Sequence, residues 1–370
     1  MKIEQNTIFE PFTFPNGVTI ANRLMMAPMT TNSSFVNGMV TTDELNYYAR
    51  RSAGLGAVIT ACAHVAENGR FEGSPSIASD VMIDNLKKLS SAIHEKGTKA
   101  ILQIFHVGRM GSRDKLKGQQ PVSASAVKAL RDNAETPHEL SHDEVLEMIK
   151  AYGEATRRAI QAGFDGVELH GANTYLIQQF FSPHSNRRTD EWGGTLEKRM
   201  AFPLAVIDAA KAAIETYAEK PFILGYRVSA EEMEEPGITM DDTLFLLNNL
   251  KTKGLDYIHL SLGHFEQTSI RNKEDKTLTL QRIATEIGKD IPVVGVGHIQ
   301  TLDDVRSTLE SGADLVAVGR QLIVEPDWVE KVINKQDIRT VIDSKNRDDL
   351  AIPDMMWEYI QNQPGWVPIE

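Results

Sequence analysis

The sequence contains a single cysteine, Cys62, among 370 residues. One thiol cannot form a disulfide within the chain, and it cannot supply the four thiolates that an iron–sulfur cluster normally requires. No Gly-x-Ser-x-Gly motif occurs, and Cys62 follows an apolar run. The sequence therefore argues against a disulfide-stabilised protein, an iron–sulfur protein and a hydrolase.

Long apolar runs and an excess of basic charge are also absent. No apolar run reaches the ~18 residues of a membrane span, and Met1 to Phe12 lack the apolar centre of a signal peptide. We therefore expect a cytoplasmic protein without a membrane partner. The net charge of −12 argues against nucleic acid as the main partner, because nucleic acid binding needs a concentrated basic surface.

Eight short apolar segments, mostly rich in Val, Ile and Leu, are each long enough for one buried parallel strand. The expected strands are Arg23–Met29, Ala57–Ala63, Lys99–Phe105, Gly166–His170, Phe222–Val228, Tyr257–Leu262, Pro292–Val296 and Leu315–Val318. Helical patterns lie between most of them, at Asp84–Glu95, Ser141–Gln161, Leu196–Thr216, Asp241–Lys253 and Leu302–Ser311. Strand–helix alternation repeated eight times favours a closed (β/α)₈ TIM barrel over an open sheet.

Two additions to the barrel are expected. Asn16-Gly17 lies between apolar runs within residues 9–20, which predicts an N-terminal hairpin. The stretch Gly111–Pro137 lies between the third and fourth strands and is a candidate lid. We expect one domain over residues 1–370, with the barrel at about 22–330 and a C-terminal extension at 331–370.

Glycines follow the last two strands, where barrels of this kind commonly bind phosphate. Gly297 follows the seventh strand, and Gly319-Arg320 follows the eighth and opens a helix. Backbone N–H groups and an arginine there can hold oxyanions. The alternative is that the glycines only permit tight turns and that Arg320 forms a surface ion pair.

Gln103 and Arg227 end two further strands, within reach of a ligand whose phosphate lies at Arg320. An amide offers a donor and an acceptor to the edge of an imide-like ring, and an arginine offers positive charge to a ring that becomes anionic on reduction. Either residue alone is often a packing or salt-bridge residue. Together they favour a flavin.

His170, Asn173 and Tyr175 follow the fourth strand. A helical turn there would point His170 and Asn173 the same way, so that both hold one carbonyl or nitro oxygen and withdraw electrons from a conjugated alkene. Tyr175 could supply a proton. The alternatives are a structural histidine, a turn-forming asparagine and a half-buried tyrosine. No metal site is expected, because the acidic partners of the strand-end histidines are scattered.

Taken together, these residues resemble the Old Yellow Enzyme family of FMN oxidoreductases, from Asn22 to about Asp327. The resemblance is carried by the runs Asn22–Met29, Gln103–Arg109, Gly163–His170, Ser182–Gly194 and Gly312–Arg320. The run Ser182–Gly194, which reads SPHSNRRTDEWGG, is close to a family signature.

The resemblance implies an FMN-dependent ene-reductase that reduces α,β-unsaturated carbonyl or nitro compounds. NADH or NADPH would first reduce the flavin in the same pocket, and hydride would then pass from flavin N5 to the β-carbon. His170 and Asn173 would bind the substrate oxygen, and Tyr175 would donate the proton to the α-carbon. The residues that the resemblance places along FMN are Pro28, Met29, Thr30, Cys62, Gln103, Arg227, Gly297, Gly319 and Arg320.

Some positions depart from particular family members. Thr30 occupies the position where one bacterial subgroup has a cysteine. Gly365-Trp366 is similar to members whose C-terminus reaches a neighbouring subunit, but the accompanying arginine is missing from Asn362 onward. This argues against completion of the site by another subunit in the homodimer or homotetramer that we expect. Without the cysteines of the iron–sulfur members, the chain is similar to the short stand-alone form.

Three alternatives remain at this stage. Another FMN barrel, of the dihydroorotate or dihydrouridine type, is disfavoured by His170, Asn173, Tyr175 and the run Ser182–Gly194. A general NAD(P)H:flavin or quinone reductase needs the same reductive half-reaction and is not separated by sequence. A non-catalytic flavin-binding protein on the same barrel is the alternative from a different class.

Overall fold

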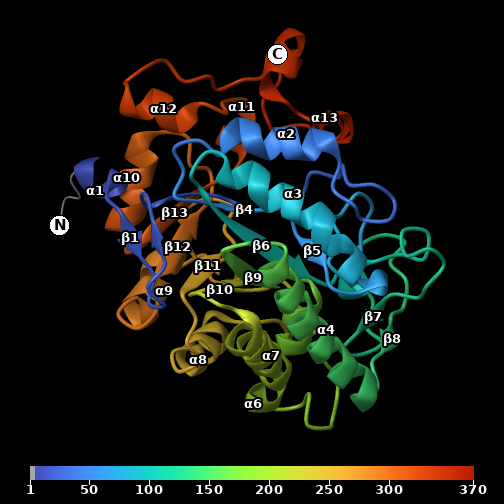
Figure 1. Cartoon of the computed structure of the whole chain (residues 1–370). Helices are drawn as coiled ribbons and strands as arrows, with labels where there is room; N and C mark the ends of the chain where they lie inside the picture. Colours follow the sequence, from blue (N-terminus) through green and yellow to red (C-terminus); the bar gives the residue numbers. More distant parts are fainter. Residues whose placement is uncertain (1–4) are drawn as a thin grey trace.

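The computed structural model describes residues 5–370, and its centre is a closed barrel of parallel strands surrounded by helices (Figure 1). The barrel strands are β3 (Leu24–Met26), β4 (Ala57–Ile59), β6 (Lys99–Phe105), β9 (Gly166–Gly171), β10 (Ile223–Val228), β11 (Tyr257–Leu260), β12 (Val293–Val296) and β13 (Leu315–Val318). Strand β4 pairs with both β3 and β6, so the ring of hydrogen bonds closes. The predicted barrel and its eight strands are confirmed.

Helices cover the outside of the barrel and explain why its strands are apolar on both faces. The covering helices are α2 (Thr42–Arg51), α3 (Ile83–His94), α4 (His142–Gln161), α7 (Ala201–Tyr217), α8 (Met240–Leu250), α9 (Thr279–Ile287) and α10 (Leu302–Glu310). Every barrel-strand residue except Lys99 is buried. Helices cover the outer face of each strand, and side chains of the barrel interior cover its inner face. Neither face is exposed to solvent, so neither is expected to carry a regular row of polar residues.

Local sequence sets where several helices begin. The Ser141 hydroxyl accepts from the Glu144 backbone N–H, and the Glu144 carboxylate accepts from the Ser141 N–H at 2.7 Å, which makes a capping box at the start of α4. The predicted single helix Leu196–Thr216 was wrong in one respect, because it divides at Met200 into α6 (Leu196–Arg199) and α7. Pro203 has no N–H for the Arg199 carbonyl and is suited to the first turn of a new helix.

The N-terminal hairpin is confirmed. Strand β1 (Phe12–Thr13) pairs antiparallel with β2 (Thr19–Ile20). The turn residue Asn16 donates from its backbone N–H and its side-chain amide to the Asp256 carboxylate, at 3.1 and 3.0 Å. Asp256 directly precedes β11, so the hairpin lies at the end of the barrel where the strands begin.

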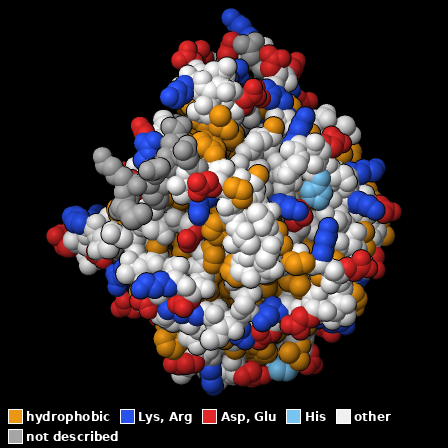
Figure 2. All heavy atoms as spheres, turned by 60° about the vertical axis from the view of Figure 1, so that its left-hand side comes forward, with side chains coloured by type: hydrophobic (Ala, Val, Ile, Leu, Met, Phe, Trp, Pro, Cys, Tyr) orange, Lys and Arg blue, Asp and Glu red, His pale blue; other side chains and the backbone are white. Residues whose placement is uncertain are grey.

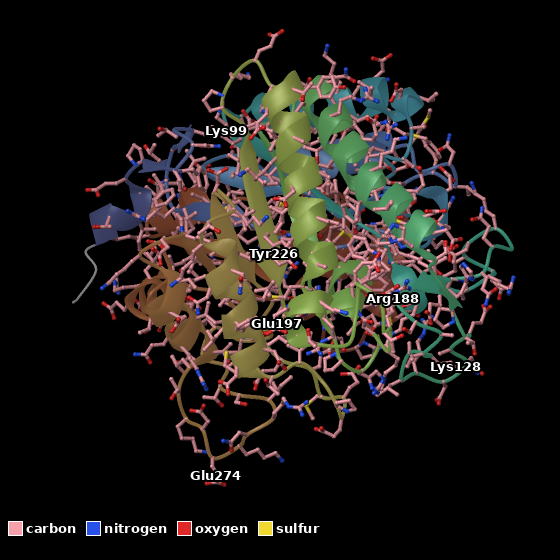
Figure 3. The ribbon with its side chains drawn as sticks, turned by 90° about the horizontal axis from the view of Figure 1, so that it is seen from below. Lys99, Lys128, Arg188, Glu197, Tyr226 and Glu274 are labelled. Atoms are coloured by element: carbon pink, nitrogen blue, oxygen red, sulfur yellow. The ribbon has the colours of Figure 1, made fainter. Side chains whose placement is uncertain are left out.

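The long loops lie at the opposite end. In Figure 3, Lys99 at the start of β6 lies at one end of the barrel, and Lys128 and Glu274 lie toward the other end. Lys128 belongs to the predicted excursion, which contains β7 (Val122–Ser123) and is followed by β8 (His138–Glu139). The excursion therefore stands at the end where the strands finish, although its movement as a lid stays a prediction.

The C-terminal extension also packs on this barrel. It contains α12 (Trp328–Ile333), η4 (Ser344–Leu350) and α13 (Asp354–Gln361), and a bridge between Ile342 and Ile369 closes it on itself. Its apolar residues join the main hydrophobic core. The remaining short elements are α1 (Gln5–Phe9), β5 (Ala63–His64), η1 (Glu67–Gly69), η2 (Asp80–Met82), η3 (Gly108–Met110), α5 (Leu176–Phe181) and α11 (Arg320–Val324). The single-domain boundary stays a prediction.

Within residues 5–370, no helix has the length and apolar character needed to cross a bilayer. Figure 2 shows acidic and basic side chains interspersed on the face that carries the N-terminal hairpin, without a large area of one sign.

A buried glycine inside the barrel provides a test of its packing. Gly225 on β10 lies opposite Tyr257 on β11, and a Cβ at Gly225 would lie 2.1 Å from the Tyr257 Cζ. We expect Gly225→Ala to lower the free energy of unfolding by about 1–3 kcal/mol, because the buried ring must move. Urea unfolding of the FMN-free protein measures this, so that any change in FMN binding does not enter the comparison. Gly263→Ala is the control, since its nearest contact would be an ordinary 3.6 Å. Equal stability of both variants would contradict the packing described.

Candidate active site

Two neighbouring cavities open where the barrel strands end. The first has a volume of about 460 Å³ and is lined by strand ends and by the C-terminal extension. It brings together six of the residues predicted to line the cofactor, namely Pro28, Met29, Arg227, Gly297, Gly319 and Arg320. Gln103 and Cys62 do not line either cavity and are 2% and 5% exposed, so their contact with a cofactor stays a prediction.

Below the first cavity, a buried carboxylate connects four strands. Glu168 on β9 accepts from Gln103 Nε2 at 2.7 Å and from His259 Nδ1 at 2.9 Å. In the β6–β9 register Gln103 stands opposite Glu168, and Arg227 stands opposite His259 in the β10–β11 register. A carboxylate accepts only, so these bonds orient the Gln103 amide with its nitrogen toward Glu168.

The same carboxylate balances the charge of Arg227. Burial alone would raise the pKa of Glu168, but the charge interaction and hydrogen bond with His259, followed by the charge of Arg227, outweigh it and lower the pKa to about 2. Burial lowers the pKa of Arg227, and Glu168 opposes that shift, so the guanidinium stays charged at neutral pH. The Arg227 Nε has no hydrogen-bond partner among the described residues. A buried cation at the cavity with an unpaired donor suits an electron-rich ring edge.

Arg320 and two glycines form the other end of the first cavity. Gly297 has φ +117°, and a Cβ there would lie 2.8 Å from the His264 backbone, so only glycine fits. The Arg320 guanidinium donates to the Trp366 carbonyl at 3.2 Å, and no carboxylate pairs with it among residues 5–370. The surface ion pair weighed as an alternative is therefore absent from this part of the chain. Trp366 lies against its own barrel.

The second cavity, of about 610 Å³, holds the predicted substrate residues Asn173 and Tyr175 together with Thr30. Its walls also include Gly111, Lys115 and Arg131 of the excursion, and Met355, Glu358, Tyr359 and Asn362 at or next to α13. The loop predicted as a lid and the C-terminal extension thus border the same opening.

The predicted helical turn between His170 and Asn173 was wrong. Asn173 and Thr174 both adopt left-handed backbone angles, with φ of +57° and +61°, and α5 begins only at Leu176. A β-branched residue such as Thr174 rarely takes this conformation, and such strain clusters at functional sites. The Asn173 Oδ1 accepts from Ser261 Oγ at 2.6 Å, and its backbone N–H donates to Ser229 Oγ at 2.9 Å. With Oδ1 engaged, the side-chain nitrogen is the part that can donate to a ligand.

His170 and Tyr175 contact each other edge to face, with ring centroids 5.0 Å apart. The Ala172 N–H donates to His170 Nδ1 at 3.3 Å, so the proton of the neutral ring belongs on Nε2. Burial and the charge of Arg227 lower the pKa of His170 to about 3, whereas burial raises the pKa of Tyr175 above its usual value. At neutral pH both groups are therefore neutral hydrogen-bond donors.

Sequence reasoning missed the residues that hold these groups in place. Ser229 and Ser261 follow β10 and β11 and bind Asn173. Glu168 lies within a matching run but had no assigned role; a carboxylate in a buried apolar strand was the signal that could have identified it. Burial raises the pKa of Cys62 to about 12, which leaves its thiol protonated and unreactive.

The residues present fit FMN better than a metal. Among the described residues, no group of three or more His, Cys, Asp or Glu side chains is arranged to hold a metal ion. Arg227, with its unpaired donor, would suit the ring of FMN, and Gly319 and Arg320 would suit its phosphate. Fold and cavity together define a flavin-binding barrel oxidoreductase.

The chain belongs to the NADH:flavin oxidoreductase / NADH oxidase family, which matches residues 7–338. The structure is similar to morphinone reductase, with a TM-score of 0.79 at 25% identity over 94% of this chain and 95% of that one. It is also similar to the old yellow enzyme from Trypanosoma cruzi, with a TM-score of 0.77 at 26% identity, covering 90% and 93%. The predicted family is confirmed, and with it FMN as cofactor and NADH or NADPH as reductant.

Similar sequences include proteins of different lengths. The NADH:acrylate oxidoreductase of Vibrio harveyi is 49% identical over 95% of this chain, and the NADH:fumarate oxidoreductase of Klebsiella pneumoniae is 45% identical over 95%. This chain spans only 35% and 38% of those proteins. It spans 99% of the probable NADH-dependent flavin oxidoreductase YqiG of Bacillus subtilis, at 43% identity over 100% of its own length.

The buried charge pair at the cavity floor can be tested by removing one partner. We expect Glu168→Gln to lower the free energy of unfolding of the FMN-free protein by about 3–5 kcal/mol, because Arg227 becomes a buried charge without a counter-charge. The double variant Glu168→Gln/Arg227→Met should recover part of that loss. Urea unfolding measures both. Glu147→Gln, at an exposed glutamate on α4, is the control. No recovery in the double variant would show that the two charges do not depend on each other.

Proposed function

We propose that this protein is an ene-reductase, which uses NADH or NADPH to reduce the carbon–carbon double bond of an α,β-unsaturated carbonyl or nitro compound. The observation that carries the proposal is the second cavity, which Asn173 and Tyr175 line together next to the flavin-type cavity. Reduction of a quinone or a free flavin places its protons on oxygen or nitrogen, where water can supply them, whereas the α-carbon of an alkene needs a positioned proton donor.

Each of these side chains has a separate role. Bound FMN supplies the hydride chemistry, accepting from the nicotinamide and donating to the β-carbon. His170 Nε2–H and the Asn173 amide hold the oxygen of the activating group and stabilise the negative charge that develops on it. Tyr175 keeps its proton at neutral pH and delivers it to the α-carbon.

Two relatives support alkene reduction by their names, which specify acrylate and fumarate. Both names describe unsaturated carboxylic acids. This chain spans about a third of each protein. Oxidation of NADH and reduction of an alkene by this chain therefore stay a proposal. The name of YqiG keeps a general flavin oxidoreductase as the second candidate.

Anaerobic stopped-flow kinetics on the FMN-loaded protein separate the two candidates. We expect NADH or NADPH to bleach the flavin absorbance near ~450 nm, and 2-cyclohexenone then to restore it. If only a quinone, free flavin or oxygen restored the absorbance, the general flavin reductase would replace the ene-reductase as the conclusion.

Tyr175→Phe tests the proton donor. We expect reoxidation by 2-cyclohexenone to slow by at least about a hundredfold, with flavin reduction by the nicotinamide changed less than about twofold, because only the alkene half-reaction needs this proton. The control is Tyr359→Phe, which removes another hydroxyl from the same cavity. Equal loss in both half-reactions would rule out the proposed role.

The two perturbed groups also predict the pH profile. The proton-donating form of Tyr175 persists until the pH rises through its raised pKa, and the neutral form of His170 persists until the pH falls toward about 3. We therefore expect the rate of flavin reoxidation by 2-cyclohexenone to change less than about twofold between about pH 6 and 9. A titration near pH 6.5 in stopped-flow rates would mean that His170 ionises in the working enzyme.

A further inference from the structure

One arginine in the second cavity has no role in the proposed function. Arg70 lines the cavity beside Phe71 and Tyr175, and it is only 4% exposed. Its Nε and one terminal nitrogen, Nη1, are buried without any hydrogen-bond partner, and no carboxylate among the described residues pairs with it. An uncompensated buried guanidinium is costly, because it gives up water and gains no counter-charge. An anionic ligand in the cavity that Arg70 lines can supply the missing counter-charge.

The backbone around Arg70 is held on both sides. The Gly69 carbonyl accepts from Val107 N–H at 2.8 Å, and a Cβ at Gly69 would lie 2.4 Å from the His106 ring. On the other side, Phe71 packs on Phe105, with centroids 5.2 Å apart, and its carbonyl accepts from the Ser74 hydroxyl at 2.9 Å. The backbone at Arg70 is therefore fixed before a ligand arrives, and only the side chain has to be ordered on binding.

Phe71 links this position to the proposed chemistry. Phe105 contacts both Phe71 and Tyr175, with ring centroids 5.2 and 5.1 Å apart, and Tyr175 contacts His170. Arg70 thus belongs to the same wall of aromatic side chains as the proposed proton donor.

The other charged groups of this cavity differ from Arg70 in exposure or pairing. Lys115, Glu72 and Glu358 are exposed. Arg131 is exposed too, and it donates to the carbonyls of Met110 and Gly111 at 2.8 and 3.0 Å. These groups form the rim, whereas Arg70 is the one cation among the lining residues that is both buried and unpaired.

We propose that Arg70 binds a carboxylate of the alkene, so that the substrate is an unsaturated acid with a second electron-withdrawing group held by His170 and Asn173. This rests on the proposed function and narrows its substrate class. A guanidinium matches a carboxylate with two parallel hydrogen bonds. The phosphates of the nicotinamide cofactor carry the same type of oxygen, but they are bulky and multiply charged, and they suit the exposed rim better than a single buried arginine.

Monomethyl and dimethyl fumarate form a matched pair of probes for Arg70. Both carry an ester that can activate the alkene, and only the monoester carries a carboxylate. For Arg70→Gln we expect the concentration of monomethyl fumarate needed for half-maximal flavin reoxidation to rise about 10- to 100-fold, as for loss of a charge-assisted pair. The response to dimethyl fumarate should change less than about twofold. Arg70→Lys should recover part of the loss, because lysine keeps the positive charge but cannot form the two parallel hydrogen bonds of a guanidinium.

A second readout needs no turnover. Monomethyl succinate, the saturated counterpart, should perturb the spectrum of the oxidised flavin on binding, with a dissociation constant about 10- to 100-fold higher in Arg70→Gln. This binding would still test Arg70 if dimethyl fumarate failed to reoxidise the unsubstituted enzyme, an outcome that would count against the proposed function alone. Arg131→Gln removes an equal charge from the rim and should change neither readout more than about twofold.

Three outcomes would overturn the assignment. Equal losses on the monoester and the diester would mean that Arg70 only shapes the cavity. A loss confined to flavin reduction by NADH or NADPH would assign Arg70 to a phosphate of the nicotinamide. Equal effects of Arg131→Gln and Arg70→Gln would mean that general charge attraction, and not a specific pair, binds the acid.

Discussion

The site depends on one buried carboxylate. Glu168 stands inside the barrel where Gln103, His259 and Arg227 meet, and its low pKa keeps it ionised. Without that negative charge Arg227 would be an isolated cation in an apolar barrel, a state that proteins avoid. The carboxylate thus permits a positive charge to lie beneath the flavin-type cavity, and it fixes the orientation of the Gln103 amide at the same time.

The closed barrel explains how so few residues define two adjoining cavities. Parallel strands end at one rim, so Arg227, His170 and Gly319 come together although they are far apart in sequence. Segments outside the strands then complete the walls. The excursion supplies Lys115 and Arg131, and the C-terminal extension supplies Tyr359 to the second cavity and Trp366 to the first. Different residues of the same C-terminal extension therefore border the two cavities.

Charge divides the second cavity into a polar rim and a deep aromatic wall. Tyr175 lies on the wall, and His170, which lines neither cavity, contacts Tyr175. Burial holds the pKa values of both neutral donors away from neutral pH. Arg70 is the exception on that wall, since it carries a full charge without a counter-charge in the protein. In the proposed function, this contrast separates the groups assigned to the reacting alkene from a group suited to binding a remote anion.

Sequence alone determined the barrel and the identity of most chemical groups. Apolar segments of strand length, capping residues and the run Ser182–Gly194 are local features, and local features are readable without coordinates. The left-handed backbone of Asn173, the pairing of Glu168 with Arg227 and the unpaired state of Arg70 were decided only by tertiary structure. The physical reason is that each depends on contacts between distant segments: Ser229 and Ser261 hold Asn173, three strands surround Glu168, and burial in the wall of the second cavity removes Arg70 from water.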